Sequence, residues 1–529
     1  MALVAFLYPV ATKIGISYPI LLVVAGLVIG IIPSLPNVVI TPDIVFLLFL
    51  PPLLFDAARH TSIHDFRKNA DAIGRLAIGL TLFTTAGVAV VAHYMIPGFT
   101  WPLAFALGAI VSPPDAVAAA AAIKGLHLPK RIVAILEGES LINDATALIA
   151  YRYAVVAVVS GTFVLWEAGL QFVLVSAGGI AIGFVVGYLF TAIINRFINN
   201  ATVETILTLI IPFMSWLVAE HVHLSGVLAV VTTGLVISWR APEIFLFQTR
   251  MQVNSFWDTF VFLLNGFVFI LIGLQLPVIL EDVSHSKMVD MIWYGLLISG
   301  VVIIIRMVWI FPTVRISDWF ARRRGLLIPP KTNGQLFIIG WSGMRGVISL
   351  ATALALPLTM ANGEAFPERN TILFITFVVI LVTLVFQGLT LPLFIKWFKV
   401  GEPPEKEMLE ERRLRLVLAN STLSFVEQQL VPKVPEQAVT EVLGRLERQV
   451  RYLNGILDED KVTCQEDLDA QHDLFEHWMN SEQAIIDHQR DLLIQMHKKG
   501  AFSAEVLKRI EQDLDSRSLT LEGRKAVFH

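Results

Sequence analysis

The chain has 529 residues, of which 55% are hydrophobic and only 16% are charged, with a formal net charge of −4 at pH 7. Soluble globular proteins are about 25% charged, so this composition excludes an ordinary soluble protein. No nucleic-acid partner is expected. The single cysteine, Cys464, excludes an internal disulfide framework and a multi-cysteine metal site.

The charges are distributed unevenly along the chain. Residues 1–400 carry 23 basic and 19 acidic side chains, whereas residues 401–529 carry 17 and 25. This division predicts a transmembrane domain at 1–400 and a water-exposed tail at 401–529. The tail is expected to be helical and cytoplasmic, with no identifiable partner, because Leu-rich tracts with helical spacing occur at 407–419, 439–457 and 466–495.

Apolar runs in the first 400 residues predict membrane-spanning helices. A helix needs roughly 20 apolar residues to cross the hydrocarbon core of a bilayer. By this criterion we expect an all-α polytopic membrane protein with about 13 transmembrane helices. They are expected near residues 2–12, 17–33, 43–58, 73–96, 101–123, 132–157, 165–195, 203–220, 224–239, 255–276, 289–312, 335–360 and 370–396. The first run is short and has no basic start, so no cleaved signal peptide is expected.

The basic residues of the connecting segments predict the orientation. If the N-terminus faces out, 18 of them lie in cytoplasmic loops and only Lys287 and Arg369 lie in outer loops. Positively charged loops stay on the cytoplasmic side, so we expect the N-terminus outside and the tail inside. The other three, Arg152, Arg306 and Arg345, fall within predicted spans. Each is expected to face a carboxylate, a carbonyl or water, because a charge in the bilayer otherwise costs at least about 2.5–3.5 kcal/mol.

The predicted span at 132–157 contains the polar sequence EGESLIND at 137–144. Ionisable residues inside a spanning helix predict a functional site. Helical spacing places Ser140 and Asp144 on one face, and Asn143 lies beside Asp144. The carboxylate, amide and hydroxyl oxygens of these residues suit a desolvated Na⁺ or Li⁺.

Asp144 is the candidate site for both a proton and a monovalent cation. A buried carboxylate is costly when it is charged and uncompensated, so it is expected to hold one or the other. A site that holds either ion, but not both, exchanges them when access alternates between the two sides of the membrane. The alternative is that Asp144 forms a structural pair with one of the three arginines.

The predicted span at 101–123 is interrupted by Ser-Pro-Pro-Asp at 112–115. Two prolines remove two backbone donors and break the helix. Non-helical backbone at membrane depth is tolerated only inside protein or beside a watery cavity. The freed carbonyls near Ser112 are candidate cation ligands, and Asp115 can compensate the N-terminal dipole of the following half-helix. A simple proline kink is the alternative.

A second interruption is expected in the span at 335–360, where glycines flank a charged residue in WSGMRGVIS at 341–349. Broken helices at corresponding places in two halves indicate the substrate site of an inverted-repeat transporter. The fourth to sixth and eleventh to thirteenth spans fit as those halves. Arg345, between the two glycines, is the expected partner of Glu139.

Six motifs together resemble the bacterial members of the monovalent cation–proton antiporter-1 family, the Na⁺/H⁺ exchangers. They occur in the family's order, as FLPPLLFDAA at 49–58, LGAIVSPPDAVAAAAAI at 107–123, LEGESLINDATAL at 136–148, LIGLQLP at 271–277, GMRGVISLATALALP at 343–357 and VFQGLTLPL at 385–393. The resemblance implies an inverted-repeat antiporter fold with crossed broken helices. It also implies a homodimer in the lipid of the bacterial inner membrane, with an elevator-like movement of a core domain against a dimerisation scaffold. The core would comprise residues of about 73–157 and 289–396, and the scaffold those of about 2–58 and 165–276.

The resemblance also implies roles for single residues. Asp144 would be the shared cation and proton site, with Asn143, Ser140, Asp115 and Ser112 as further ligands. Glu139 and Arg345 would form a stabilising ion pair. An Asn-Asp pair at this place implies electroneutral exchange of one cation for one proton.

The ion selectivity is left open by a departure from the family pattern. The family's usual Thr-Asp-Pro is replaced here by Pro114-Asp115-Ala116, so a hydroxyl ligand is lost. Na⁺ is the expected cation, and exchange of K⁺ or of a broader set including Li⁺ is the main alternative.

Two other classes of protein are weighed against an antiporter. A cation channel would need a repeated pore loop or rings of charge, and a membrane-bound enzyme would need a catalytic dyad or metal ligands at an aqueous face. Neither is found, and no Walker A pattern is present, so we expect neither enzymatic activity nor a cofactor.

Overall fold

The structure is a computed structural model in which the chain divides into two compact units, Met1–Glu402 and Pro403–His529. It describes residues 2–14, 18–30, 32, 45–123, 126, 128–161, 165–198, 200–281, 285–323, 332–360, 363–401 and 404–430, and short pieces of the remaining tail. Within these residues the chain is helical, and β-structure is limited to one isolated bridge between Thr359 and Ala365.

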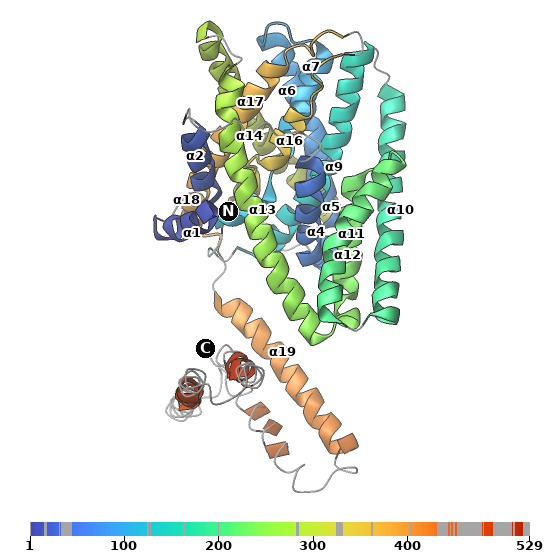
Figure 1. Cartoon of the computed structure of the whole chain (residues 1–529), viewed down its shortest axis with the longest axis vertical. Helices are drawn as coiled ribbons and strands as arrows, with labels where there is room; N and C mark the ends of the chain where they lie inside the picture. The colour runs from blue at the N-terminus through green and yellow to red at the C-terminus, as the bar shows by residue number, and fades with distance from the viewer. Residues whose placement is uncertain are drawn as a thin grey trace, which may run out of the picture. The chain divides into compact units, whose positions relative to one another are not determined.

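The first unit is a bundle of α-helices joined by π-helical turns (Figure 1). Its α-helices are α1 (Ala2–Ile14), α2 (Tyr18–Gly30), α4 (Leu50–His60), α5 (Ile63–Gly74), α6 (Thr81–Met95), α7 (Trp101–Val111), α8 (Ala116–Ile123), α9 (Lys130–Ser160), α10 (Leu165–Phe197), α11 (Ala201–His221), α12 (Gly226–Ile244), α13 (Phe247–Glu281), α14 (His285–Arg323), α15 (Asn333–Trp341), α16 (Val347–Leu354), α17 (Arg369–Val382) and α18 (Gly388–Phe398). The π-helical turns are η1 (Val45–Phe49), η2 (Arg75–Leu80) and η3 (Thr383–Gln387).

Eight helices of the described chain are long and apolar enough to cross a membrane. They span Ile63–Met95, Lys130–Ser160, Ala168–Phe197, Ala201–His221, Gly226–Ile244, Phe247–Gln275, Met288–Ile316 and Arg369–Phe398. The protein is therefore an integral membrane protein. Helices occupy all thirteen stretches predicted as spans, but the number that cross a bilayer stays a prediction.

Several helices extend beyond the apolar stretches that predicted them. Residues 63–72, expected to be a loop, form the polar start of one continuous helix through α5, η2 and α6. Its first turn is capped by the Ser62 hydroxyl, which accepts a hydrogen bond from the Asp65 N–H at 3.3 Å. Hydropathy identifies only the lipid-facing part of a helix, so it misses such polar extensions.

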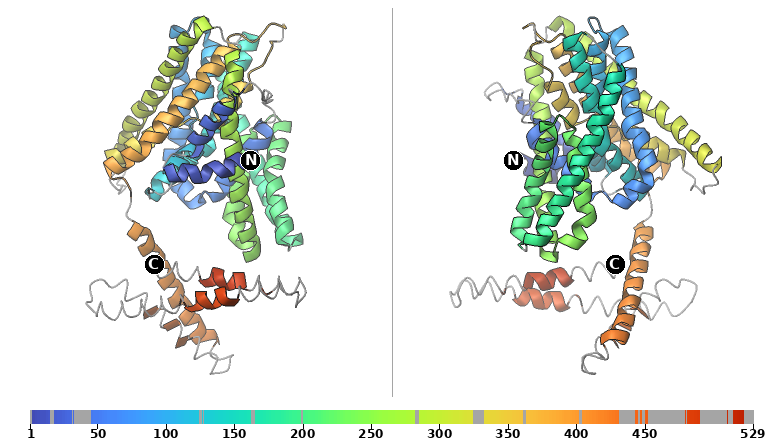
Figure 2. Two further views of the ribbon diagram at one scale, coloured as in Figure 1. Left: turned by 60° about the vertical axis from the view of Figure 1, so that its left-hand side comes forward. Right: turned by 90° about the vertical axis from the view of Figure 1, so that its right-hand side faces the viewer.

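Figure 2 shows the helices of the first unit from two further sides. Their side chains pack around two apolar clusters. The first cluster includes side chains of α1, α2, α6–α8, the second half of α13 and α14–α18, and the second includes side chains of α4, α10–α12 and the first half of α13. Helix α9 contributes to both, with Ile135 and Tyr151 in the first and Leu141, Ala145 and Leu148 in the second. It therefore lies between the two groups of helices and carries the EGESLIND motif into the interior.

In the second unit, α19 (Pro404–Phe425) is followed by the π-helical turn η4 (Val426–Leu430). The predicted helical tract at 407–419 lies within α19, whereas those at 439–457 and 466–495 fall mostly outside the described residues. Met479, Ile486 and Leu521 form a small buried cluster of this unit. Its cytoplasmic placement and its role stay predictions.

Candidate functional site

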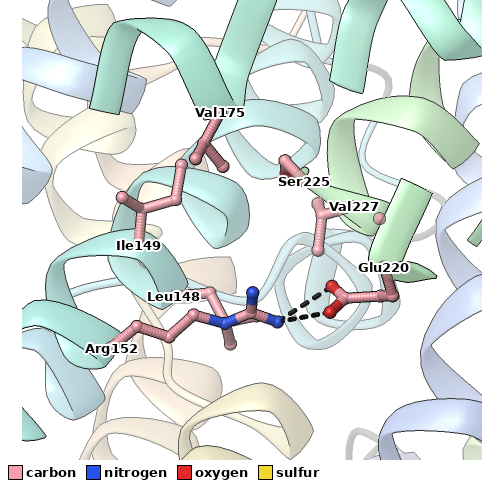
Figure 3. A pocket seen from close by; sticks show the side chains of 8 residues that line it. Leu148, Ile149, Arg152, Val175, Glu220, Ser225 and Val227 are labelled. Atoms are coloured by element: carbon pink, nitrogen blue, oxygen red, sulfur yellow. Dashed lines mark hydrogen bonds and ion pairs between the residues drawn. The ribbon is translucent and has the colours of Figure 1, made fainter. Parts of the chain in front are cut away.

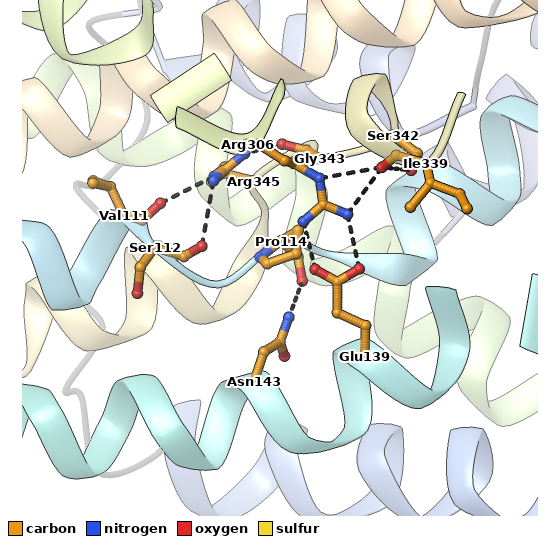
Figure 4. Close-up of polar contacts among 10 residues, drawn as sticks. All are labelled: Val111, Ser112, Pro114, Glu139, Asn143, Arg306, Ile339, Ser342, Gly343 and Arg345. Carbon is orange, nitrogen blue, oxygen red and sulfur yellow. Dashed lines mark hydrogen bonds and ion pairs between the residues drawn. The ribbon is translucent and has the colours of Figure 1, made fainter. Parts of the chain in front are cut away.

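The two interruptions predicted from the sequence are both present, and they lie against each other (Figure 4). One separates α7 from α8, and the other separates α15 from α16. The N–H of Asp115 in the first donates to the carbonyl of Met344 in the second at 2.7 Å. Four half-helix ends therefore meet at one place in the interior of the first unit.

The Asp115 carboxylate lies at the N-terminal ends of two half-helices. Its Oδ1 accepts hydrogen bonds from the N–H groups of Val117 and Ala118 in α8, at 2.8 and 3.4 Å. Its Oδ2 lies against Gly346, the residue that precedes α16. A negative charge at a helix N-terminus is favourable because it compensates the helix dipole. The expected interaction of Asp115 with the half-helix after the break is confirmed, and it extends to α16.

The Arg345 guanidinium lies at the opposite ends, the C-termini of α7 and α15. Its Nε donates to the carbonyl of Val111 at 3.0 Å, its Nη2 to that of Ser112 at 3.3 Å, and its Nη1 to that of Gly343 (Figure 4). The backbone N–H of Arg345 donates to the Thr383 hydroxyl at 3.1 Å. The buried Arg345 guanidinium thus satisfies carbonyls freed by both breaks. The Asp115 carboxylate plays the corresponding role at the N-terminal ends of α8 and α16.

Glu139 forms its ion pair with Arg306 of α14, so the predicted pair with Arg345 is wrong. The two guanidinium nitrogens Nη1 and Nη2 of Arg306 donate to the two carboxylate oxygens, the second at 2.8 Å. Arg306 also donates to the carbonyl of Ile339 in α15, from Nε at 3.3 Å and from Nη2 at 3.1 Å. The N–H groups of Arg345 donate instead to the backbone carbonyls at the two helix breaks. Which arginine pairs with Glu139 depends on how the helices pack in three dimensions.

The third arginine within a predicted span, Arg152, pairs with Glu220 of α11 (Figure 3). All three arginines therefore face carboxylates or carbonyls, as their cost in a bilayer requires.

Asn143 and Asp144 lie in α9 beside the first break, and both are buried. The Asn143 Nδ2 donates to the carbonyl of Pro114 at 3.2 Å. Its Oδ1 is buried and accepts no hydrogen bond from the described residues. An orphaned buried acceptor is rare in a folded protein and calls for a cation or donor to satisfy it.

Asp144 is 2% exposed, and it forms no ion pair within the described part of the chain. The carboxylates of Asp115 and Glu139 lie close enough to interact electrostatically with it. The arginines proposed as structural partners are directed elsewhere, so the alternative reading of Asp144 as half of a structural pair is not what the structure contains. Within the described residues, the Asp144 carboxylate is therefore buried without an ion-pair partner.

The two serines proposed as ligands differ in their surroundings. Ser140 is half-buried in α9, one turn before Asp144. Ser112 is buried in the break, where its hydroxyl donates to the carbonyl of Ala109 at 3.1 Å and its own carbonyl accepts from Arg345. Ser112 thus contributes to holding the break, and a role as ligand for it, for Ser140 or for Asp115 stays a proposal.

Sequence reasoning missed the turn that supports Arg345. Thr383 begins η3, and Gln387 ends it with a fully buried amide that has no hydrogen-bond partner in the described chain. Isolated π-helical turns often occur at functional sites. The motif at 385–393 pointed to this region only through the family resemblance.

Comparison with known proteins identifies the family. The family described as "Sodium/hydrogen exchanger, transmembrane" matches residues 2–397. The chain belongs to the sodium/hydrogen exchanger family. The exchanger is 31% identical over 546 residues to an uncharacterised Na⁺/H⁺ exchanger of Escherichia coli (strain K12), covering 97% of this chain and 96% of that protein.

Another relative is the "Sodium, potassium, lithium and rubidium/H(+) antiporter" of Bacillus pumilus (strain SAFR-032). It is 36% identical over 388 residues, which are 72% of this chain but only 57% of the relative. Among solved structures, the sodium proton antiporter MjNhaP1 of Methanocaldococcus jannaschii matches 76% of this exchanger and 97% of that chain with a TM-score of 0.58. At 18% identity this likeness shows a shared fold.

The contact between the two breaks makes Gly346 a sharp test of the site. An added Cβ at Gly346 would lie 2.6 Å from the carboxyl carbon of Asp115, so Gly346→Ala must displace the carboxylate from both half-helices. We expect this variant to lower the melting temperature of the detergent-solubilised exchanger and to abolish its transport. Gly300→Ala in α14 is the matched control, because nothing lies within 4 Å of its added Cβ. Equal behaviour of the two variants would contradict the described packing.

Proposed function

We propose that this exchanger moves a monovalent cation across the membrane in exchange for a proton, and that both ions use Asp144. The observation that supports this most strongly is the buried Asp144 carboxylate without an ion pair in the described chain, beside the meeting point of two broken helices. In a transporter, half-helix ends and freed backbone groups at such a place form the ion site. Membership of the sodium/hydrogen exchanger family favours the same function.

The surroundings of Asp144 supply what competition between two ions requires. Ionised Asp144 faces like charges on Asp115 and Glu139, and burial adds to the cost of its charge. A proton removes that charge, and a cation compensates it, but either excludes the other. The orphaned Oδ1 of Asn143 is the second oxygen proposed to contact the cation, with Ser140, Ser112 and Asp115 as further candidates.

Na⁺ is the proposed cation, and a broader set that includes K⁺ and Li⁺ is the alternative. The name of the Bacillus pumilus relative includes potassium, lithium and rubidium beside sodium, which favours the broader set. At the position of the family's usual Thr hydroxyl, the backbone carbonyl of Pro114 accepts a hydrogen bond from Asn143. This contact orients the amide so that its oxygen remains available.

Alternating access is proposed to arise from movement between the two groups of helices. The core would contain α6–α9 and α14–α18, and the scaffold would contain α1, α2, α4 and α10–α13. We further propose that the scaffold forms a homodimer contact, that the protein lies in the lipid of a bacterial inner membrane, and that its tail is cytoplasmic. An elevator-like mechanism needs the polar site to travel with the core, and the Glu139–Arg306 pair joins α9 to α14 within that group.

The proposal predicts electroneutral exchange by the purified protein in proteoliposomes. With a pH gradient set by buffer, addition of Na⁺, K⁺ or Li⁺ should collapse the gradient for the transported cation. Because one proton is exchanged for one cation at a single carboxylate, clamping the membrane voltage should leave the rate unchanged. A gradient that none of the three cations collapses would refute the proposed function, and a voltage-dependent rate would refute the 1:1 exchange.

A further inference from the structure

Two side-chain contacts join one end of α9 to the neighbouring helices of the second group. The Nη2 of Arg152 donates to both carboxylate oxygens of Glu220 in α11, at 2.8 and 3.0 Å (Figure 3). The hydroxyl of the next residue, Tyr153, donates to Oε1 of Gln171 in α10 at 2.5 Å. Both contacts therefore lie at one level of α9, about 12 Å along the helix axis from Asp144.

Glu220 is held firmly by the second group of helices. The chain turns sharply after α11, with His223 in the left-handed region at φ 58°. Next, the N–H of Ser225 donates to the carbonyl of Val175 and so ties the turn to α10. Gly226 leaves room for the carboxylate, because an added Cβ there would lie 3.2 Å from Oε1 of Glu220. Glu220 is therefore fixed to the helices α10–α12, whereas Arg152 is carried by α9.

Between Asp144 and Arg152, α9 carries mostly apolar side chains. Residues 145–149 of α9 are all buried, whereas several residues on the other side of Asp144, including Ser140 and Ile142, are partly exposed. The ion pair lies over a small cleft lined by Leu148, Ile149, Val175, Ser225, Gly226 and Val227 (Figure 3). On the Arg152 side, Asp144 is thus covered by a closely packed and mostly apolar layer, and the Arg152–Glu220 ion pair lies beyond that layer.

The two kinds of contact resist movement differently. Apolar faces such as Leu141, Ala145 and Leu148 against α4 and α12 have no directional bonds, so they can slide without leaving a polar group unsatisfied. An ion pair is satisfied in one register only, and its rupture leaves two charges to be solvated. The side chains of Arg152 and Glu220 are 46% and 28% exposed, so water can solvate their charges once the two side chains separate.

We propose that Arg152 and Glu220 form a latch that closes the path to Asp144 from the end of the molecule that carries Arg152. This inference rests on the proposed function, because it takes α9 to move against α10–α12 during exchange. The latch is closed in this structure and opens when access switches to that end, which the charge distribution predicts to be the outer one. Both are positioning residues, and neither contacts the transported ion.

The latch is tested by the accessibility of the cleft beneath it. Cys464 is the only cysteine, so Cys464→Ser with Val227→Cys places one reporter thiol in the cleft, at a position that is 1% exposed. Proteoliposomes are treated with a membrane-impermeant maleimide from the side of Arg152. We expect Glu220→Gln and Arg152→Gln each to raise the labelling rate about two- to fivefold, which is the population shift that a partly exposed ion pair can produce.

Two further variants complete the test. The charge exchange Arg152→Glu with Glu220→Arg should restore slow labelling, because it restores the pair. Asp71→Asn is the matched control, since Asp71 pairs with Arg75 within one helix and its loss should leave labelling unchanged. Labelling of Glu220→Gln at the control rate, or fast labelling of the charge-exchanged protein, would overturn the latch. Cation-driven proton movement in the same proteoliposomes is scored separately, so a failure of the proposed function is distinguishable from a failure of the latch.

Discussion

Arg306→Met should destabilise the exchanger by about 3–5 kcal/mol, because removal of one partner of a buried ion pair leaves the other charge uncompensated. Glu139 and Arg306 are each about 1% exposed. The same substitution also deprives the Ile339 carbonyl of its donor. The free energy of unfolding of the detergent-solubilised protein, measured by denaturant titration, is the direct readout.

The double variant Arg306→Met with Glu139→Gln should recover much of this loss. It removes both charges, and replacement of a whole buried pair by neutral groups is often nearly neutral. Arg75→Met is the matched control, because Arg75 pairs with the exposed carboxylate of Asp71 inside one helix, and such pairs contribute about 0–1 kcal/mol. Similar losses for Arg306→Met and Arg75→Met would contradict the buried pair as described.

Asp144→Asn should abolish exchange while leaving the protein at least as stable as the wild type. Asparagine keeps the size of the side chain, but it binds no exchangeable proton and carries no charge to compensate a cation. It also removes a carboxylate that faces Asp115 and Glu139. The measurement pairs cation-driven proton movement with the melting temperature, because a purely structural Asp144 would lose stability on substitution.

Much of the site could be predicted from the sequence, because its features are local. Two adjacent prolines, Pro113 and Pro114, separate α7 from α8 in the middle of a predicted span, because each lacks the backbone N–H that a helix interior needs. Asp115 follows its break directly, so its place at the N-terminus of α8 followed from helix electrostatics.

The partner of Glu139 could not be predicted, because it depends on packing between helices distant in sequence. Three arginines lay within predicted spans, and helical periodicity does not say which of them faces α9. The carbonyls that engage Arg345 become available only where the two breaks meet. Arg306, 167 residues from Glu139, takes the carboxylate instead.

The pattern of apolar residues also could not predict where the helices begin and end. The extension of α5 depends on a Ser62 cap and a polar helical turn, which hydropathy reads as a loop. The contact between Asp115 and Gly346 is likewise invisible in the sequence, since it joins two segments only after both helices have broken.

The most direct test of the shared-carboxylate mechanism compares wild type with Asp144→Asn in proteoliposomes that hold a buffer-set pH gradient. Na⁺, K⁺ and Li⁺ are added in turn, and the internal pH is followed with time. We predict that at least one cation collapses the gradient with wild type and that none does so with Asp144→Asn above the rate of empty liposomes. Equal collapse by both proteins would show that Asp144 carries neither ion and would contradict the proposed mechanism.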